Sequence, residues 1–398
     1  MQKLFSLFLL VALTMPARGQ SARDNMEIVV IADRDTIPVR VSANTPELTA
    51  LAQRAFSVHG RYKLNPTEYA YDIKFALVSP TQVRVEITKG KAGTPFLAGE
   101  VATGTNSRNA LLRAADIAVV KTNGQGLRGF FTAKLGFIRD QGRVKEVCVS
   151  DLFFSDGYVQ VTHDNALALT PRWAPDGSKL LYTSYYKSGS PDIFQINLAT
   201  NQRTNFVSFR GTNTGAHYSP NGSQVAMILT GEGTTEIYTS SALGGRVSRV
   251  AKTRTEAAKS SPCFSPDGSR IVFAMEPGPQ LYVMPVSGGT PQRVFRDFGY
   301  AAEPDWSTTK PNLIACTVQS GGFQIAVYDF EKNKAEVVSK APFDGIEPSW
   351  LADGRHLIYT ARTRTESRIC ILDTETGRTA FLSPKSFGNA SQASVWTP

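Results

Sequence analysis

The sequence predicts a small α/β domain followed by an all-β, six-bladed β-propeller that the C-terminal strand closes. Two observations predict this architecture. A short motif, in which an aromatic residue precedes a tight turn and apolar runs, recurs along the last two thirds of the chain. The segment before it mixes strand-like and helix-like patterns instead. We therefore expect a signal peptide at residues 1–19, the α/β domain at 20–125 and the propeller at 126–398.

The first nineteen residues have the pattern of a secretory signal. Lys3 precedes an apolar run from Leu4 to Met15, and small residues follow up to Gly19. The run is too short to span a membrane. We expect cleavage before Gln20, export, and a mature protein without a membrane span.

The next hundred residues predict an α/β domain. Thr45 is placed to cap a helix that Pro46 starts, with apolar residues on one face. Two alternating runs flank Ser79-Pro80 and predict a hairpin. The expected strands are residues 26–32, 36–42, 72–79 and 81–88, and the second expected helix is residues 107–121.

The recurring motif sets the number of blades. Its aromatic residues are Trp173, Tyr218, Phe264, Trp306, Trp350 and Trp396, separated by 45, 46, 42, 44 and 46 residues. A period in the forties, built from short strands and turns, is typical of a four-stranded propeller blade. After Trp173, for example, Pro175-Asp176-Gly177 forms a turn, because Pro fixes φ and Gly accepts a positive φ.

The last copy of the motif predicts how the ring closes. Too few residues follow Trp396 to build another blade, whereas residues 135–139 and 145–150 are strand-like and have no aromatic inner strand of their own. We expect the C-terminal segment to supply the inner strand of the first blade, which would leave no open sheet edge.

Charge and cysteine usage exclude several classes of protein. The formal net charge is +9, but the basic residues are spread along the chain, so a nucleic-acid partner is not expected. Cys148, Cys263, Cys316 and Cys370 show no zinc-ligand spacing. Each lies in an apolar run, which favours buried free thiols, although a disulfide stays open for an exported protein.

These features resemble the TolB family of exported β-propellers. The most specific match is "VSDLFFSDGYVQVTHDNALALTPRWAPDGSKLLYTSY" at residues 149–185, supported by "GGTPQRVF" and "EPDW". The resemblance implies a periplasmic, non-catalytic component of the Tol-Pal system that binds the peptidoglycan-associated lipoprotein Pal at the mouth of the propeller. Such proteins support envelope integrity and outer-membrane constriction during division.

The resemblance also implies site residues. The residues expected at the Pal-binding mouth are Thr212, Asn213, His217, Ala302, Glu303, Asp305 and Glu347. The N-terminal strand that would engage TolA of the inner membrane contains Met26, Glu27, Ile28 and Val29. Other Tol components are further expected partners.

Three other functions are alternatives to this one. A stand-alone exported propeller could bind another protein or a glycan. A propeller lyase would need clustered metal-binding histidines, but His59, His163, His217 and His356 fall in unrelated phases of the repeat. A propeller peptidase would need a G-x-S-x-G elbow, and the sequence has none. We therefore expect no catalytic residue and no resident metal or cofactor.

Three carboxylates leave a binding role open. Glu303, Asp305 and Glu347 are expected to precede inner strands and so to gather near one mouth of the channel. They could form a polar rim that binds basic groups or a cation in the channel, or they could serve only as caps of turns.

Overall fold

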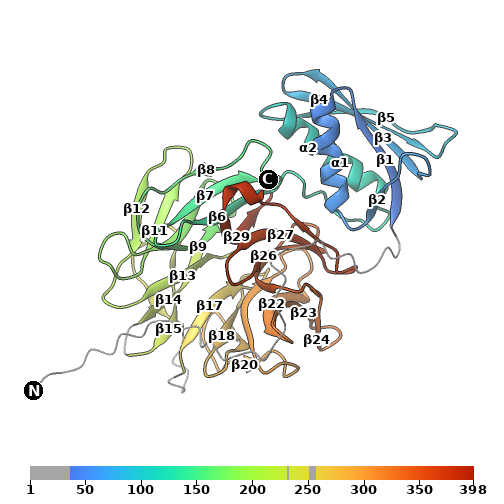
Figure 1. Cartoon of the computed structure of the whole chain (residues 1–398). Helices are drawn as coiled ribbons and strands as arrows, with labels where there is room; N and C mark the ends of the chain where they lie inside the picture. Colours follow the sequence, from blue (N-terminus) through green and yellow to red (C-terminus); the bar gives the residue numbers. More distant parts are fainter. Residues whose placement is uncertain (1–35, 231–232, 251–256) are drawn as a thin grey trace, which may run out of the picture.

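The computed structural model describes residues 36–230, 233–250 and 257–398, coloured along the sequence in Figure 1. The predicted signal peptide, the strand expected at residues 26–32 and its Met26–Val29 segment lie outside the described residues.

The first region is a five-stranded sheet with two helices. Its strand order is β2-β1-β3-β4-β5, with β1 parallel to β2 and β3 and the other pairs antiparallel. Helix α1 packs on β1 and β2, and α2 packs on β3 to β5. The elements are β1 (Ile37–Ala43), α1 (Pro46–Val58), β2 (Tyr62–Leu64), β3 (Tyr71–Ser79), β4 (Gln82–Lys89), β5 (Thr94–Thr103) and α2 (Ser107–Thr122).

Most elements predicted in this region are confirmed. The Thr45 hydroxyl accepts a hydrogen bond from the backbone N–H of Leu48, and Pro46 is the first helical residue. The sequence did not predict β2 or β5. Strand β5 is an edge strand that is mostly exposed, so it lacks the apolar alternation that marks a half-buried strand.

Six four-stranded sheets follow in the described residues, each with antiparallel strands. Blade 1 contains β29 (Asn389–Trp396), β6 (Lys134–Asp140), β7 (Lys145–Asp151) and β8 (Val159–Gln160). Blade 2 contains β9 (Ala168–Trp173), β10 (Lys179–Ser184), β11 (Asp192–Asn197) and β12 (Arg203–Val207). Blade 3 contains β13 (Asn213–Tyr218), β14 (Gln224–Thr230), β15 (Thr235–Ser241) and β16 (Ser248–Arg249). Blade 4 contains β17 (Lys259–Phe264), β18 (Arg270–Met275), β19 (Gln280–Pro285) and β20 (Gln292–Arg293). Blade 5 contains β21 (Ala301–Trp306), β22 (Leu313–Gln319), β23 (Phe323–Asp329) and β24 (Lys334–Val337). Blade 6 contains β25 (Asp344–Trp350), β26 (His356–Arg362), β27 (Ser367–Asp373) and β28 (Thr379–Phe381), and a 3-10 turn (Lys385–Phe387) leads from it to β29.

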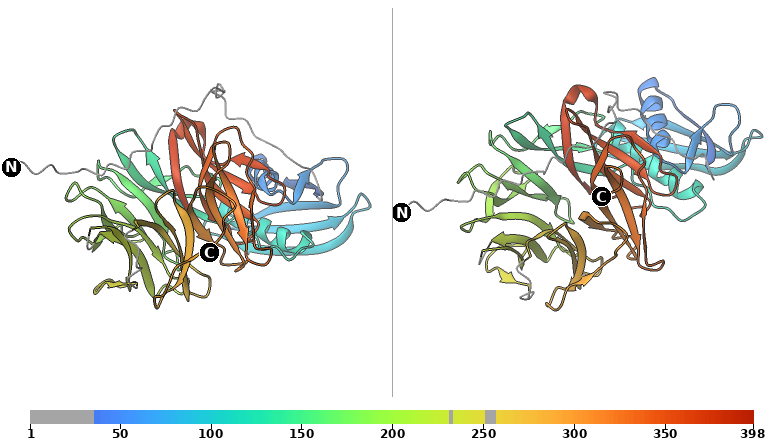
Figure 2. Two further views of the ribbon diagram at one scale, coloured as in Figure 1. Left: turned by 90° about the horizontal axis from the view of Figure 1, so that it is seen from below. Right: turned by 60° about the horizontal axis from the view of Figure 1, so that its bottom comes forward.

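The C-terminal strand closes the ring, as predicted. Strand β29 pairs antiparallel with β6 from Asn389–Asp140 to Trp396–Lys134. The blades follow one another in a circle, so the first and last lie side by side (Figure 2). Figure 1 shows the red β29 next to the green β6. Both ends of the propeller chain are thereby paired within one sheet.

The register corrects one detail of the repeat. In blade 5, Asp305 and Trp306 are the first two paired residues after a bulge in the inner strand. In blade 1 the corresponding residues are Ser394 and Val395, so Trp396 lies one residue beyond the aromatic position. Its ring instead stacks on Trp173 of blade 2, with 5.9 Å between the ring centroids.

The aromatic residues fasten neighbouring blades. The indole N–H of Trp173 donates to the backbone carbonyl of Ser394 at 3.2 Å, and that of Trp350 donates to the carbonyl of Asp305 at 3.1 Å. In both cases the bond joins one inner strand to that of the preceding blade.

All four cysteines are buried free thiols, as favoured from the sequence.

The α/β region docks on blades 1 and 6. One continuous hydrophobic core joins Phe56 of α1 to Phe130 and Phe131 of the connecting segment and to Ile358 of β26. Arg54 of α1 donates to backbone carbonyls of both blades.

No helix within the described ranges is long and apolar enough to cross a membrane.

Candidate functional site

Bulges in the inner strands create the lining of the channel. Each inner strand shifts register against its neighbour near its middle. One residue at each bulge has a positive φ, and such residues re-aim the side chains around them. These residues are Thr170, Gly215, Ser261, Glu303, Glu347 and Gln392, which we call the bulge ring. They line a small cavity of about 90 Å³.

A second set of equivalent residues lies further along the same strands. These are the first paired residues after each bulge, which in five blades directly precede the aromatic residue. They are Arg172, His217, Cys263, Asp305, Ser349 and Ser394, which we call the channel ring. They line a cavity of about 520 Å³ that the tight turns between the first and second strands surround.

The carboxylates of the bulge ring connect blades. Glu303 accepts hydrogen bonds from the hydroxyl of Thr317 at 2.7 Å and from the backbone N–H of Glu347 in the next blade at 3.0 Å. Glu347 in turn accepts from the backbone N–H of Gln392 at 3.0 Å. Burial and the nearby charge of Glu347 raise the pKa of Glu303 to about 7. These two carboxylates therefore fasten three blades and also face the channel.

The channel ring combines chemically different side chains from successive blades. One ring nitrogen of His217, Sγ of Cys263 and one carboxylate oxygen of Asp305 lie within 4.8 Å of one another. Burial and the charge of Arg172 lower the pKa of His217 to about 4, so this imidazole is neutral at pH 7. Burial also raises the pKa values of Cys263 and Asp305.

The structure separates the residues predicted at the partner-binding mouth. His217 and Asp305 belong to the channel ring, and Glu303 and Glu347 belong to the bulge ring. The expectation that Glu303, Asp305 and Glu347 precede their inner strands was wrong, because these residues lie within β21 and β25. The reason is that both strands begin earlier than the sequence indicated.

The other predicted residues do not face the channel. Asn213 is buried, and its amide donates to the carbonyls of Phe209 at 2.8 Å and Pro191 at 3.1 Å, which fixes two loops at the start of β13. Thr212 is half-buried just before that strand, and Ala302 is buried in the core of blades 4 and 5.

Sequence reasoning missed Arg172 and Cys263 as channel residues. A signal existed, because His217 directly precedes Tyr218, the aromatic residue of its copy. The same position in the other copies holds Arg172, Cys263, Asp305 and Ser349. Ser394 could not be found in this way, because the aromatic residue of the last copy is shifted by one position.

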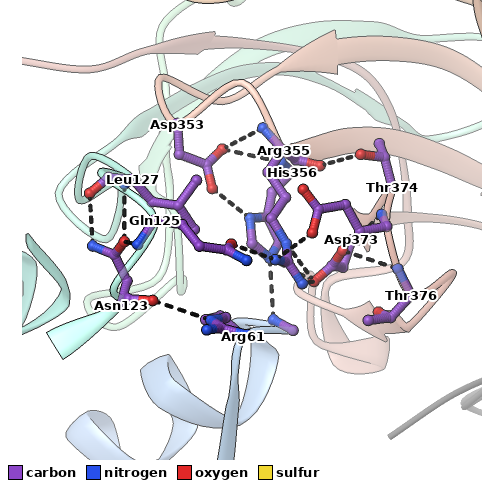
Figure 3. A network of polar contacts seen from close by, with 12 residues as sticks. Arg61, Asn123, Gln125, Leu127, Asp353, Arg355, His356, Asp373, Thr374 and Thr376 are labelled. Atoms are coloured by element: carbon purple, nitrogen blue, oxygen red, sulfur yellow. Dashed lines mark hydrogen bonds and ion pairs between the residues drawn. The ribbon is translucent and has the colours of Figure 1, made fainter. Parts of the chain in front are cut away.

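A buried polar cluster joins the α/β region to blade 6 (Figure 3). Asp373 accepts from the Arg355 guanidinium at 2.7 and 3.0 Å, and Asp353 contacts Nδ1 of His356 at 2.6 Å. On the other side, the backbone N–H of Gly60 lies 3.1 Å from Nε2 of His356. We call Asp353, Arg355, His356 and Asp373 the docking cluster.

The docking cluster balances its own charge. Burial lowers the pKa of His356, but the charges of Asp353 and Asp373 outweigh this effect and raise the pKa to about 9. The Gly60 contact suits a neutral ring, whereas an imidazolium would donate to Asp373, whose oxygen lies 3.4 Å away. We take the imidazolium as the form present at pH 7, since two buried carboxylates then face two cations.

The fold and the channel define a six-bladed β-propeller protein with a docked α/β region. The family model described as the TolB beta propeller domain (PD40) matches residues 124–398. The chain therefore belongs to the TolB β-propeller family.

Curated relatives carry the same family name. Over 166 residues, or 41% of its length, the chain is 30% identical to the Tol-Pal system protein TolB of Bordetella pertussis. It matches the proteins of the same name from Bordetella parapertussis and Bordetella bronchiseptica to the same extent. The aligned stretch spans only 37% of the length of these relatives.

Solved structures share the fold at low sequence identity. The crystal structure of TolB from Acinetobacter baumannii is similar over 93% of this chain and 98% of that chain, with a TM-score of 0.79 and 18% identity. A putative TolB from Agrobacterium tumefaciens is similar over 67% of this chain and 98% of that chain, with a TM-score of 0.52 and 17% identity. At these identities the likeness establishes the fold alone.

Proposed function

We propose that the chain is a non-enzymatic scaffold of the Tol-Pal system, exported to the periplasm. Its propeller would bind the peptidoglycan-associated lipoprotein Pal at a mouth of the channel, and the complex would support envelope integrity and outer-membrane constriction during division. The observation that carries this proposal is the family match across the whole closed ring, from residue 124 to residue 398. The curated relatives are named as Tol-Pal components, which supports the same assignment.

The mouth next to the bulge ring is the more suitable docking face. Loops from successive blades converge there, which lets one partner contact several blades at once. Three exposed apolar side chains lie on neighbouring loops of blade 2: Leu167, Tyr186 and Phe209, which are 36%, 50% and 54% exposed. The amide of Asn213 holds the Phe209 loop against the Pro191 loop. Exposed aromatic residues of this kind are frequent anchors of protein interfaces.

A calorimetric titration with the soluble domain of the organism's own Pal tests the proposal. We expect binding by the full mature chain, weakened about tenfold or more by Phe209→Ala. Leu243→Ala is the matched control, because Leu243 is 92% exposed at the turn after β15, at the opposite end of the blades. An unchanged affinity in Phe209→Ala would move the docking face elsewhere. No binding by the wild type would favour a stand-alone propeller with another protein or glycan as partner.

Engagement of TolA by the N-terminal segment is part of the proposal. Residues Met26–Val29 would pair with a strand of TolA, as the family resemblance implies. Deletion of residues 20–31 should abolish binding to the soluble part of TolA and leave binding to Pal intact. Unaltered TolA binding after the deletion would refute this assignment.

A further inference from the structure

The channel ring holds an unusual set of donor atoms. His217, Cys263 and Asp305 occupy the same position in blades 3, 4 and 5, so the ring geometry itself brings them together. Their donor atoms lie within 4.8 Å of one another, with Sγ of Cys263 and Oδ1 of Asp305 3.8 Å apart. All three line the 520 Å³ cavity, which gives them a route to solvent.

Each side chain is oriented by a bond that leaves a donor atom free. Nδ1 of His217 lies 2.9 Å from the carbonyl oxygen of Tyr218. A carbonyl only accepts, so Nδ1 carries the proton and Nε2 presents a lone pair. Histidines that bind metals are commonly held by this kind of hydrogen bond to a carbonyl.

The other two side chains are held by the backbone of the following blade. Oδ2 of Asp305 accepts the N–H of Trp350 at 2.7 Å, which leaves Oδ1 on the side of Cys263. Sγ of Cys263 accepts the N–H of Trp306 at 3.4 Å. An N–H donor of this kind stabilises a thiolate once a cation is bound.

We propose that His217, Cys263 and Asp305 form a binding site for a divalent transition metal of the zinc class. The donors are one imidazole nitrogen, one thiolate and one carboxylate oxygen, a set that suits Zn²⁺ and disfavours Ca²⁺ and Mg²⁺, which prefer oxygen ligands. Three protein ligands leave a fourth position open towards the channel. Binding releases the thiol proton of Cys263 to solvent, so affinity rises with pH.

Arg172 shapes the open position. It is the neighbour of His217 in the channel ring and lines the same cavity. The metal charge is balanced by one thiolate and one carboxylate, so the guanidinium leaves a net positive site. The fourth ligand is therefore expected to be an anion, such as a carboxylate or chloride.

Titration of the metal-free mature chain with Co²⁺ tests the site, because a bound thiolate gives a charge-transfer band in the near ultraviolet. We expect one Co²⁺ per chain, displaced by Zn²⁺ but not by Ca²⁺. Cys263→Ser should abolish the band, and His217→Gln and Asp305→Asn should each weaken binding at least about tenfold. Cys316→Ser is the control, since Cys316 is an equally buried thiol of β22 outside the channel ring.

A second measurement covers the case in which Cys263→Ser does not fold. Zn²⁺ should raise the unfolding temperature of the wild type by mass action, and the same Zn²⁺ concentration should raise that of His217→Gln clearly less. The absence of a charge-transfer band in the wild type, its persistence in Cys263→Ser, or equal stabilisation by Ca²⁺ would each overturn the proposal. None of these readouts depends on the binding of Pal.

Discussion

Removing the charge of Asp373 should destabilise the protein far more than the same change at an equivalent residue one blade away. Asp373 ends β27 in blade 6, and Asp329 ends β23 in blade 5. Both accept a backbone N–H in the following turn, from Glu375 and Glu331, at 2.9 Å in each case. Asp373 alone also holds Arg355 and lies 3.4 Å from Nε2 of His356 inside the docking cluster.

The expected magnitude follows from burial. The side chains of Asp373 and Arg355 are 0% and 3% exposed, so Asp373→Asn leaves the buried Arg355 cation with the half-exposed carboxylate of Glu375 as its remaining ion-pair partner. Breaking a buried ion pair in this way costs about 3–5 kcal/mol. Asp329 forms an ion pair with Lys332, which is 71% exposed, and accepts a hydrogen bond from the side-chain amide of Asn312 at 2.9 Å. Asp329→Asn should therefore cost no more than about 1 kcal/mol, because exposed ion pairs contribute little.

Guanidinium unfolding followed by tryptophan fluorescence compares the two variants. Hydrogen exchange then locates the effect, since Asp373→Asn should also loosen α1 and the Gly60 segment that contacts His356. Equal loss of stability in both variants, or unchanged exchange in α1, would refute the role assigned to the docking cluster.

Three further predictions concern pH and the ring. The pKa of His356 is raised to about 9 from an ordinary 6.5, so its protonation contributes about 3 kcal/mol to the free energy of unfolding below pH 6.5, and this contribution is lost as pH rises through 9. Unfolding free energies measured from pH 6 to 10 should show this fall, and a flat profile would contradict it. The pKa of Glu303 is raised to about 7, so the folded protein loses stability as pH rises from 4.5 to 7. Glu303→Gln should therefore be more stable than the wild type at pH 8, by on the order of 1–3 kcal/mol. A lower unfolding midpoint for this variant at pH 8 would show that the hydrogen bonds of Glu303 matter more than its charge. A Cβ at Gly177 (φ +71°) would lie 2.3 Å from the Trp396 ring, whereas at Gly268 (φ +71°) the nearest atom is 4.0 Å away. Gly268→Ala should lower the free energy of unfolding by about 1–2 kcal/mol through its backbone alone, and Gly177→Ala by about 1–3 kcal/mol more. Equal shifts in the thermal unfolding midpoint would argue against Trp396 packing on this turn.

The sequence predicted the propeller well because its signals are local. Each tight turn and each aromatic residue is recognisable from a few neighbouring positions, and the number of copies of the motif gives the blade count. The helices of the α/β region were predictable for the same reason, since Thr45 and Pro46 mark a helix start without tertiary information.

The details that failed depend on contacts between distant segments. A bulge is invisible in an isolated strand, so neither the one-residue shift of Trp396 nor the composition of the channel ring could be fully predicted. The docking cluster lies within blade 6, but its contact with the α/β region forms only when Gly60 meets His356 across the domain contact. Neither the sequence around Gly60 nor the sequence around His356 contains a motif that indicates this contact.

Hydrogen exchange of the C-terminal strand tests the closed ring most directly. Strand β29 forms the inner strand of blade 1 through its pairing with β6, as β21 does in blade 5 through β22. Amides of residues 389–396 should therefore be protected to the same degree as those of residues 301–306 and exchange only on global unfolding. Exchange of β29 within seconds, while β21 stays protected, would contradict the closed six-bladed ring on which both proposed sites rest.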